Sequence, residues 1–282
     1  MASVSQTRQA PRNGKSMPSE SRPVTVPDFL AAKERGVKLC LLTAYDYTMA
    51  RLLETAGVDG VLVGDSLGMV VQGQENSLAV TLEEMIYHSR MVARALRRSL
   101  LIVDMPFMSF QVSPRQALKN AGRLIKEGQA HAVKVEGGVR SAAAIAAITK
   151  MDIPVMGHIG LTPQSIRRLG GFRVQRQEKQ LMEDALATQE AGAFAVVLEC
   201  IPAATAQNIT QALHIPTIGI GAGSGCDGQV LVTHDMLGLF SDLSPRFVKH
   251  FGEIGQAIVE AVTTYCQEVR EGTFPAEEHE FR

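Results

Sequence analysis

Short apolar runs alternate with longer amphipathic segments from residue 38 onward. The runs are rich in β-branched residues, and most are apolar on both faces, which is typical of parallel strands that are covered on both sides. Seven runs predict strands, namely Lys38–Thr43, Gly60–Gly64, Leu100–Asp104, Ala132–Glu136, Ile153–His158, Phe194–Glu199 and Pro216–Ile220. The pattern therefore predicts a regular alternation of strand and helix.

The segments between these runs carry the signals that begin and end helices. Apolar residues share one face between positions 49 and 56, and Gly57 follows as the expected C-cap. Thr81 and Glu84 have the spacing of a capping box at the start of the next segment. Ser113, followed by a proline, opens a third helix, which a glycine at position 128 closes.

Strict alternation of strand and helix leaves two architectures, an open doubly wound sheet or a closed barrel. The number of units and the length of 282 residues favour a single (β/α)8 TIM barrel, which we expect over residues 25–282. Its eighth strand would be the weak segment Arg246–His250, followed by a helix around Ile254–Val269. An additional helix is expected around Gln229–Leu237.

The first 24 residues differ from the rest, because they are rich in Ser, Pro, Arg and Gln and have no apolar periodicity. This composition predicts a flexible N-terminal tail. No apolar segment follows its charges, so a secretory signal is excluded. The segment carries four basic residues and one acidic residue, which leaves a mitochondrial transit peptide as an alternative to a cytoplasmic location.

Composition narrows the range of partners. The chain is 45% hydrophobic and 20% charged with a formal net charge of −1, so it can bury a large core but lacks the basic excess that nucleic acid or an anionic membrane would attract. No apolar run is long enough to span a bilayer. Cys40, Cys200, Cys226 and Cys266 are far apart, which is typical of reduced thiols in a cytoplasmic protein.

Acidic side chains stand at or just beyond the ends of three predicted strands. Asp65 follows the second strand, Asp104 ends the third and Glu136 ends the fourth. In barrels and open α/β sheets, functional residues gather at the C-terminal ends of the strands. Oxygen ligands of this kind suit a hard cation, Mg²⁺ or Mn²⁺, and no group of His or Cys accompanies them to favour zinc. We therefore predict a metal site formed by these three carboxylates.

Other polar residues extend the same pattern. Lys134 has the same strand parity as Glu136, so both side chains point to the inside of the barrel. His158 ends the fifth predicted strand and Glu199 ends the sixth. Buried charges must be paired or bound to a metal to offset their desolvation. Individually such residues could cap the next helix or form ion pairs, but together they indicate one site.

Two short motifs suggest other chemistry. Gly64–Gly68 matches the G-x-S-x-G nucleophile elbow and places Ser66 after a strand, so that Asp104 and His158 could complete a hydrolase triad. The GDSL esterases, however, use a late Asp-x-x-His, which this chain lacks, and a triad leaves the other strand-end charges unexplained. Gly219–Gly225 is glycine-rich but fails the G-x-G-x-x-G pattern, so it indicates either close backbone approach to a ligand or a tight turn.

Longer motifs carry a resemblance to a known family. They occur in order over about residues 25–281, namely Thr43–Asp46, Val63–Met69, Asp104–Phe107, Val133–Gly138, Gly157–Gln164, Val197–Cys200, Ile218–Gly223, Asp227–Gln229 and Phe274–His279. In these segments the chain resembles the ketopantoate hydroxymethyltransferases, which belong to the phosphoenolpyruvate/pyruvate barrel superfamily. The motifs are long and numerous, which makes the resemblance specific.

The resemblance implies that a one-carbon unit is transferred from 5,10-methylenetetrahydrofolate to 3-methyl-2-oxobutanoate, giving 2-dehydropantoate in the first step of pantothenate biosynthesis. It also implies one Mg²⁺ per subunit, a metal-stabilised enolate and a homodecamer. Asp65 and Asp104 would bind the metal, and Glu136 would complete its shell directly or through water. Ser66 and Lys134 would hold the keto acid.

The resemblance further implies that Glu199 is the proton acceptor. The metal set is therefore Asp65, Asp104 and Glu136, and His158 joins the substrate-binding residues Asp65, Ser66, Asp104 and Lys134. A base must lie off the metal if its affinity for a proton is to be kept, and Glu199 is two strands beyond Glu136. A Mg²⁺-dependent carbon–carbon lyase or mutase of the same superfamily and a GDSL-type serine hydrolase are the alternatives.

The chain departs from the family pattern after Gln175. The family usually continues through a glycine and a longer acidic loop, whereas here Arg176–Lys179 runs almost directly into the next helix. If that loop covers the active site, binding of the folate would differ from the family's.

Overall fold

A computed structural model describes residues 22–242 and 245–281 of the chain. Nearly all of the predicted tail lies outside these residues, and so does the alternative interpretation of it as a transit peptide. The last tail positions contact the domain, since the backbone N–H of Val24 donates to Arg98 O over 2.7 Å.

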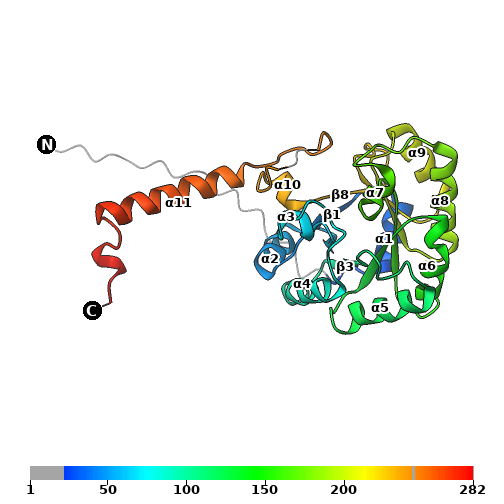
Figure 1. The fold of residues 1–282 in the computed structure, drawn as a ribbon, viewed down its shortest axis with the longest axis horizontal. Coiled ribbons are helices and arrows are strands. Elements are labelled where there is room, and N and C mark those ends of the chain that lie inside the picture. Colours follow the sequence, from blue (N-terminus) through cyan, green and yellow to red (C-terminus); the bar gives the residue numbers. More distant parts are fainter. Residues whose placement is uncertain (1–21, 243–244, 282) are drawn as a thin grey trace.

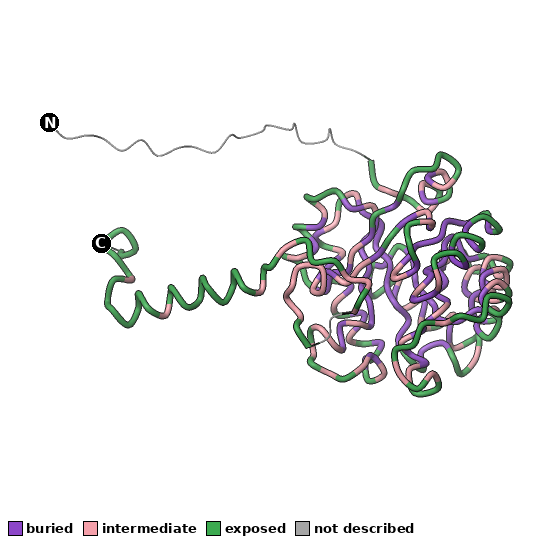
Figure 2. Tube along the Cα trace, turned by 90° about the horizontal axis from the view of Figure 1, so that it is seen from above, coloured by how far each residue is buried: buried purple, intermediate pink, exposed green. Residues whose placement is uncertain are grey.

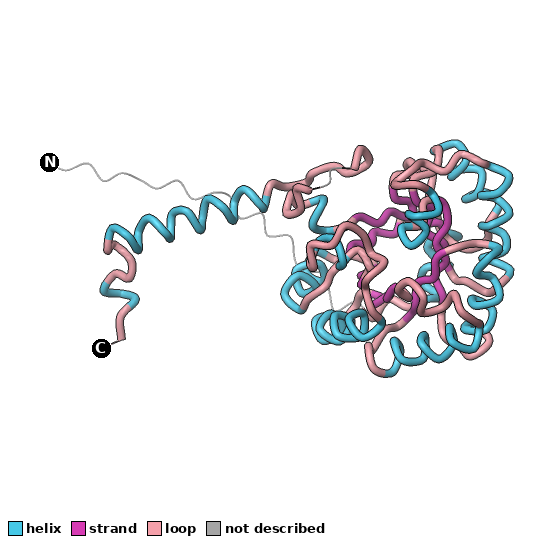
Figure 3. Tube along the Cα trace, in the orientation of Figure 1, coloured by secondary structure: helices cyan, strands magenta, loops and turns pink. Residues whose placement is uncertain are grey.

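Eight parallel strands form a closed barrel in which each strand pairs with its neighbours in sequence and the last pairs with the first. Figure 3 shows the strands as a ring with helices outside it. The strands are β1 (Leu39–Thr43), β2 (Gly60–Val63), β3 (Leu100–Asp104), β4 (Ala132–Glu136), β5 (Val155–Gly160), β6 (Ala195–Glu199), β7 (Thr217–Ile220) and β8 (Gly228–Leu231). The prediction of a single (β/α)8 barrel is confirmed.

The prediction of the eighth strand was wrong. Arg246–His250 is not a strand: Val248 N–H closes a turn on Pro245 O over 2.9 Å. The eighth strand is instead β8, which takes up the first three residues of the helix predicted at Gln229–Leu237, and only Thr233–Met236 of that segment form a helix. A Cβ at Gly228 would lie 2.6 Å from Leu39 O, so glycine allows β8 to pack closely against β1.

Helices surround most of the barrel (Figure 1). They are α1 (Val26–Glu34), α2 (Tyr47–Ala56), α3 (Leu67–Val70), α4 (Leu82–Ala95), α5 (Pro114–Lys126), α6 (Ala142–Thr149), α7 (Ile166–Leu169), α8 (Glu178–Glu190), α9 (Ala203–Ala212), α10 (Thr233–Met236) and α11 (Ile254–Glu271). The predicted C-cap Gly57, capping box Thr81–Glu84 and N-cap Ser113 are confirmed. Residues 221–227 join β7 to β8 without a helix, which breaks the regular alternation.

The strands bury their two faces in two different cores. The outward-facing Val133 and Val135 of β4 pack with apolar residues of the surrounding helices. Inward-facing residues such as Leu62, Ile102 and Val197 form a second core inside the barrel. Lys134 and Glu136 point inward, as predicted, at the end of the barrel where the strands finish.

The other end of the barrel is closed by α1. Phe29 of this helix is fully buried in the inner core and contacts Phe194 edge-to-face, with ring centroids 5.7 Å apart. Lys33 of the same helix pairs with Asp227 over 2.8 Å, just before β8. The N-terminal end of the barrel is therefore filled by packed side chains.

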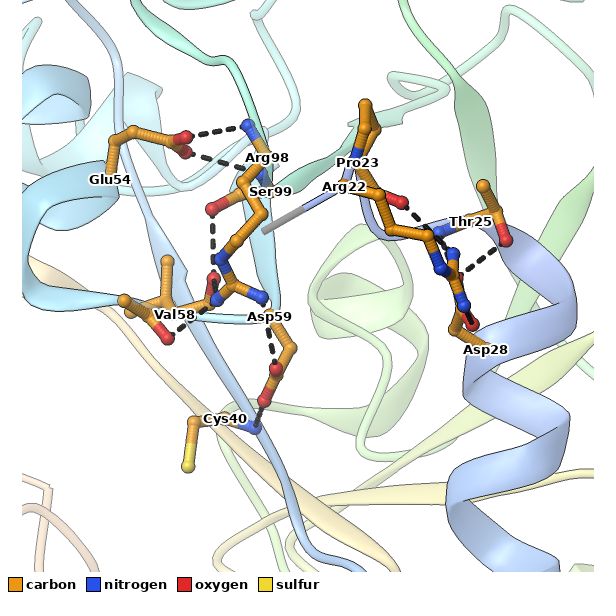
Figure 4. Close-up of polar contacts among 11 residues, drawn as sticks. Arg22, Pro23, Thr25, Asp28, Cys40, Glu54, Val58, Asp59, Arg98 and Ser99 are labelled. Atoms are coloured by element: carbon orange, nitrogen blue, oxygen red, sulfur yellow. Dashed lines mark hydrogen bonds and ion pairs between the residues drawn. The ribbon is translucent and has the colours of Figure 1, made fainter. Parts of the chain in front are cut away.

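A polar network ties the loops together at this N-terminal end (Figure 4). The carboxylate of Glu54 accepts three backbone N–H bonds, from residues 97, 98 and 99. The Arg98 guanidinium donates to the carbonyls of Gly57 and Val58, each over 2.7 Å, and lies 3.8 Å from Asp59. These bonds fasten the start of β3 to the end of α2.

Helix α11 leaves the barrel instead of packing on it (Figures 1 and 2). The predicted helix at Ile254–Val269 is present, but its expected position as the eighth barrel helix is wrong. None of its residues is buried. Ile258, Val262, Tyr265 and Val269 lie at helical spacing, and 46–55% of each remains exposed. Backbone bonds at Phe251 and Ile254 fix where the helix departs beside α10.

Part of the outer surface of the barrel, where β1 pairs with β8, is also exposed. Cys40 of β1 and Gln229 of β8 are register partners, point outward and are exposed, whereas Val133 and Val135 of β4 are fully buried.

Among the described residues, no helix has the length and apolar character needed to cross a membrane.

Candidate active site

A cavity of about 390 Å³ opens at the C-terminal ends of the strands. Its walls are largely apolar and include Phe172, Val197, Ile220 and Phe247. Its floor holds every residue predicted from the strand ends, namely Asp65, Ser66, Asp104, Lys134, Glu136, His158 and Glu199. The barrel thus brings together side chains that are up to 134 positions apart in sequence.

Lys134 forms an ion pair on one side of this floor. Its Nζ lies 2.8 Å from Asp104 Oδ1, and both side chains are almost completely buried. The other oxygen of Asp104 accepts the backbone N–H of Asp65 over 3.1 Å. Asp104 therefore connects the tip of β2 with the inward-facing lysine of β4.

His158 links the two glutamates of the site. Its Nε2 lies 3.1 Å from Glu199 Oε2, and its Nδ1 lies 3.6 Å from Glu136 Oε1. The same Nδ1 is 3.3 Å from Lys134 Nζ. His158 lies between a fully enclosed carboxylate and one that is 14% exposed to the cavity.

The charges of the floor are not balanced. Burial, together with the nearby charges of Asp104 and Glu136, raises the pKa of Asp65 to about 8. Burial also raises the pKa of Asp104, against the opposing effect of Lys134. Burial opposes the charged form of Lys134, but the surrounding carboxylates outweigh it and raise the lysine pKa. The site has more carboxylates than cations to pair with them.

The surroundings of His158 show the same excess of negative charge. Burial and Lys134 oppose its protonation, but Glu136 and Glu199 outweigh them and raise the histidine pKa to about 9. For Glu136, burial is outweighed by His158, which lowers the glutamate pKa. Additional positive charge would therefore stabilise this cluster.

The chemistry of the donors suits a hard cation, although the side chains do not form a closed metal shell. Asp104 Oδ1 and Glu136 Oε1 are buried and accept no hydrogen bond of good geometry, in spite of their nearby cations. Oxygen atoms in this state are available to a metal. Within residues 22–242 and 245–281, however, no three acidic, His or Cys side chains already have the spacing of a metal site.

Ser66 is not placed as the nucleophile of a triad. Its Oγ hydrogen-bonds with the hydroxyl of the buried Tyr45 over 2.8 Å, while His158 contacts the two glutamates and Lys134. Burial raises the pKa of Tyr45, so this phenol is a neutral partner. Tyr45 lies in the motif Thr43–Asp46, but nothing in that sequence indicates its contact with Ser66.

Gln164 is a second residue that the strand pattern did not reveal. It lies on the loop after β5 and is 7% exposed. Its side-chain amide donates to Asp65 Oδ2 over 2.9 Å, and its backbone N–H donates to Glu136 Oε2 over 3.1 Å. It belongs to the motif Gly157–Gln164, which is the one signal in the sequence that could have found it.

The glycine-rich segment after β7 has a packing role. Gly221 has a φ of +62°, and a Cβ there would lie 2.8 Å from the ring of Phe247. This close approach brings Phe247 to the wall of the cavity. This contact fits the interpretation of Gly219–Gly225 as tight geometry, and the other interpretation, backbone approach to a ligand, stays a prediction.

The fold is similar to that of several solved enzymes. Phosphonopyruvate hydrolase, solved in complex with oxalate and Mg²⁺, aligns with a TM-score of 0.59 and 15% identity, over 90% of this chain and 93% of that one. Phosphoenolpyruvate phosphomutase from Streptomyces platensis aligns with a TM-score of 0.60 and 16% identity, over 92% of each chain. At these identities the likeness concerns the barrel alone.

The sequence has much closer relatives. The 3-methyl-2-oxobutanoate hydroxymethyltransferase of Pelobacter propionicus is 58% identical over 261 residues, which cover 92% of this chain and 97% of that protein. The enzyme of the same name from Clostridium novyi is 56% identical over 92% of this chain and 95% of that protein. The model of the ketopantoate hydroxymethyltransferase family matches residues 23–277. The chain therefore belongs to the ketopantoate hydroxymethyltransferase family.

Proposed function

We propose that the chain transfers a hydroxymethyl unit from 5,10-methylenetetrahydrofolate to 3-methyl-2-oxobutanoate and so forms 2-dehydropantoate, in the first step of pantothenate biosynthesis. The relatives carry the name of this activity. The observation that carries the proposal is the buried group of strand-end charges on the floor of the cavity. Carboxylates and a lysine in this position suit a small 2-keto acid that must lose a proton from carbon.

Asp65, Asp104 and Glu136 are the residues that would hold one Mg²⁺. They supply oxygen donors, and the raised pKa of Asp65 indicates that its negative charge lacks compensation. Bound there, the ion would act as a Lewis acid on the keto and carboxylate oxygens of the substrate.

Glu199 is the residue we assign as proton acceptor. It is partly open to the cavity and touches neither Asp65 nor Asp104 among the contacts described, so it stays apart from the metal ligands. Its carboxylate would take the proton from C3 of the keto acid, and C3 would then form a bond to the one-carbon unit of the folate. Water supplies the hydroxyl group of the product, the two carbon–nitrogen bonds of the methylene carbon break, and tetrahydrofolate leaves with both nitrogens protonated, one by the proton from C3 and one by the remaining proton of water.

The remaining polar residues would bind and orient the keto acid. Lys134 provides a positive charge for the oxygen on which negative charge develops when C3 loses its proton. Ser66, held by Tyr45, can donate a hydrogen bond to the substrate carboxylate. His158 contacts Glu199 and so can orient the base.

A direct assay tests this proposal. Purified protein with Mg²⁺, 3-methyl-2-oxobutanoate and 5,10-methylenetetrahydrofolate should yield 2-dehydropantoate, and removal of the metal with EDTA should stop the reaction. Failure to form this product at any metal concentration would contradict the proposal. If the keto acid is cleaved or rearranged when folate is omitted, the chain is a lyase or mutase instead.

We also propose that the enzyme is a homo-oligomer, for which the resemblance implies ten subunits. Within the described residues the apolar stripe of α11 is exposed, and so are Cys40 and Gln229 on the outer faces of β1 and β8. The α11 of a second copy could cover these outer faces. Light scattering should show an assembly, and Val262→Asp should break it, whereas Thr263→Asp on the polar face should not. A monomeric wild-type protein would contradict this.

We place the enzyme in the cytoplasm. Its four cysteines are free, which suits a reducing compartment. Fractionation of cells, with the protein detected by antibody, would test this location.

A further inference from the structure

Gln164 joins two carboxylates from different parts of the barrel, one through its side-chain amide and one through its backbone N–H. Its Nε2 donates one hydrogen bond to Asp65 Oδ2 and one to Met105 O, both over 2.9 Å. Its backbone N–H donates to Glu136 Oε2 over 3.1 Å. One residue therefore fixes an oxygen of Asp65 at the tip of β2 and an oxygen of Glu136 at the tip of β4.

A second glutamine fixes the orientation of this amide. The Oε1 atom of Gln164 accepts a hydrogen bond from Gln111 Nε2 over 2.9 Å. Gln111 is oriented in turn, because its own Oε1 accepts the backbone N–H of Phe110 over 3.3 Å. If the Gln164 amide turned over, its Nε2 would face another donor, Gln111 Nε2. Its Oε1 would then face two acceptors, Asp65 Oδ2 and Met105 O. The chain of amides thus keeps the NH₂ group of Gln164 on Asp65.

These bonds select which oxygen of each carboxylate faces a cation. Asp65 Oδ2 and Glu136 Oε2 are engaged by Gln164, so Asp65 Oδ1 and Glu136 Oε1 are left for another partner. Glu136 Oε1 is buried without a hydrogen-bond donor. In Asp104 the backbone N–H of Asp65 engages Oδ2 in the same manner. Each of the three carboxylates has one oxygen held by a hydrogen bond of these kinds, while Asp104 Oδ1 faces Lys134 Nζ over 2.8 Å and Glu136 Oε1 faces His158 Nδ1 over 3.6 Å.

An amide suits this task because it is neutral. A lysine or arginine in its place would also orient the carboxylates, but it would cancel part of the charge that attracts a divalent ion. A hydrogen bond from an amide restricts rotation of the carboxylate and leaves its charge in place. Residues around metal ligands commonly act in this way.

We propose that Gln164 is a positioning residue for the metal site, that it presents one oxygen each of Asp65 and Glu136 to the ion, and that Gln111 holds it in the required orientation. This inference rests on the metal site of the proposed function. It concerns the binding of the ion before any substrate is present, so it can be tested without the reaction.

Titration of the full-length, metal-free protein with Mn²⁺, followed by the electron paramagnetic resonance signal of the free ion, tests this proposal. Gln164→Met keeps the length of the side chain and removes the hydrogen bonds of its amide with Asp65, Met105 and Gln111, while the backbone bond to Glu136 remains. We expect it to weaken Mn²⁺ binding by about 10- to 100-fold. Gln111→Met should weaken binding by about 2- to 10-fold, because it removes only the outer bond. The control Gln116→Met changes a glutamine of α5 that donates to Met108 O, and its affinity should equal that of wild type.

Each outcome has a definite meaning. If Gln164→Met is folded by circular dichroism and binds Mn²⁺ as tightly as wild type, the positioning role is overturned. If Gln164→Met does not fold, Gln111→Met decides, and wild-type affinity in that variant overturns the role of the amide chain. If the wild-type protein itself does not bind Mn²⁺, the metal site of the proposed function is overturned. If metal binds normally but 2-dehydropantoate is not formed, only the proposed reaction fails.

Discussion

The two ends of the barrel use polar residues in opposite ways. At the N-terminal end, Glu54 accepts three backbone bonds, and the Arg98 guanidinium donates to two carbonyls. Accordingly, these hydrogen bonds outweigh burial and lower the pKa of Glu54. At the C-terminal end, burial and neighbouring charges raise the pKa of Asp65 to about 8. One end is electrostatically satisfied, and the other keeps an excess of negative charge.

This difference separates stability from chemistry within one fold. Satisfied bonds and the packed ring of Phe29 hold the strands together at one end. At the other end, the same strands hold Asp65, Asp104 and Glu136 close together although their charges repel. A cluster of this kind persists only because the rest of the barrel is stable enough to impose it. Substitutions at the two ends should therefore have different kinds of effect.

The largest effect is expected for Glu199→Gln at the C-terminal end. Loss of the proton acceptor should lower kcat by about 10²- to 10⁴-fold. The melting temperature should change little, since Glu199 lies at the edge of the cavity. Steady-state kinetics and thermal melts would measure both. Glu190→Gln, on the exposed side of α8, is the control, and an unchanged kcat in Glu199→Gln would remove this residue from the mechanism.

Phe29→Ala should show the reverse pattern at the N-terminal end. The ring is fully buried against Phe194, so its loss should lower the free energy of unfolding by about 3–5 kcal/mol. The kcat of the folded fraction should remain near that of wild type. Denaturant unfolding would measure the change, with the neighbouring, partly exposed Leu30→Ala as control. A large loss of kcat without loss of stability would show that the two ends are not separable.

Asp65→Asn should stabilise the metal-free protein at high pH. The raised pKa means that the folded state holds the proton more tightly than the unfolded state does. Ionising this carboxyl in the folded state lowers the free energy of unfolding. This loss is absent below the unfolded pKa, grows as the pH rises and is complete above about 8. The melting temperature of Asp65→Asn should exceed that of wild type by on the order of 5 °C at pH 8.5.

The same comparison at pH 4 should show a much smaller difference, because Asp65 is protonated in the folded state there and roughly half protonated in the unfolded state. Melting in EDTA across this pH range would give both values. A variant that melts below wild type at pH 8.5 would show that Asp65 stabilises the fold.

Glu54→Ala should have the smallest of these effects. It leaves three backbone N–H groups without their acceptor, but water can reach this partly exposed site, so the free energy of unfolding should fall by only about 1–2 kcal/mol. The kcat should not change. Denaturant unfolding would measure the loss, and Glu34→Ala at the exposed end of α1 provides a control. Full wild-type stability would mean that the Arg98 bonds suffice by themselves.

The sequence predicted the architecture well because each strand satisfies a local pattern. Seven apolar runs fell on β1–β7, and the caps at Gly57, Thr81 and Ser113 are as expected. The eighth strand escaped prediction because Gly228–Leu231 is short and begins with glycine, which only the close approach of β1 explains. The position of α11 escaped for a related reason: an amphipathic pattern predicts a helix and its apolar face, not the surface that covers it.

The candidate site followed from the strand ends, but its internal contacts did not. Strand parity placed Lys134 and Glu136 inside the barrel, and all the predicted residues line one cavity. The pairing of Lys134 with Asp104 depends on the register between β3 and β4, which no local pattern specifies. Gln164 and Tyr45 lie on loops or beside strands, where no periodicity separates a contact with the site from a structural bond. Their contacts with the site can be recognised only in the three-dimensional structure.

The exposed stripe on α11 has a consequence for how the protein unfolds. If a second copy covers Ile258, Val262 and Tyr265 as proposed, the folded state contains more than one chain and the unfolded state contains one. The melting temperature must then rise with protein concentration, as mass action requires. Dilution alone would weaken the enzyme, without any change in pH, salt or sequence, and the concentration of the chain in the cell would become one of the quantities that determine its stability.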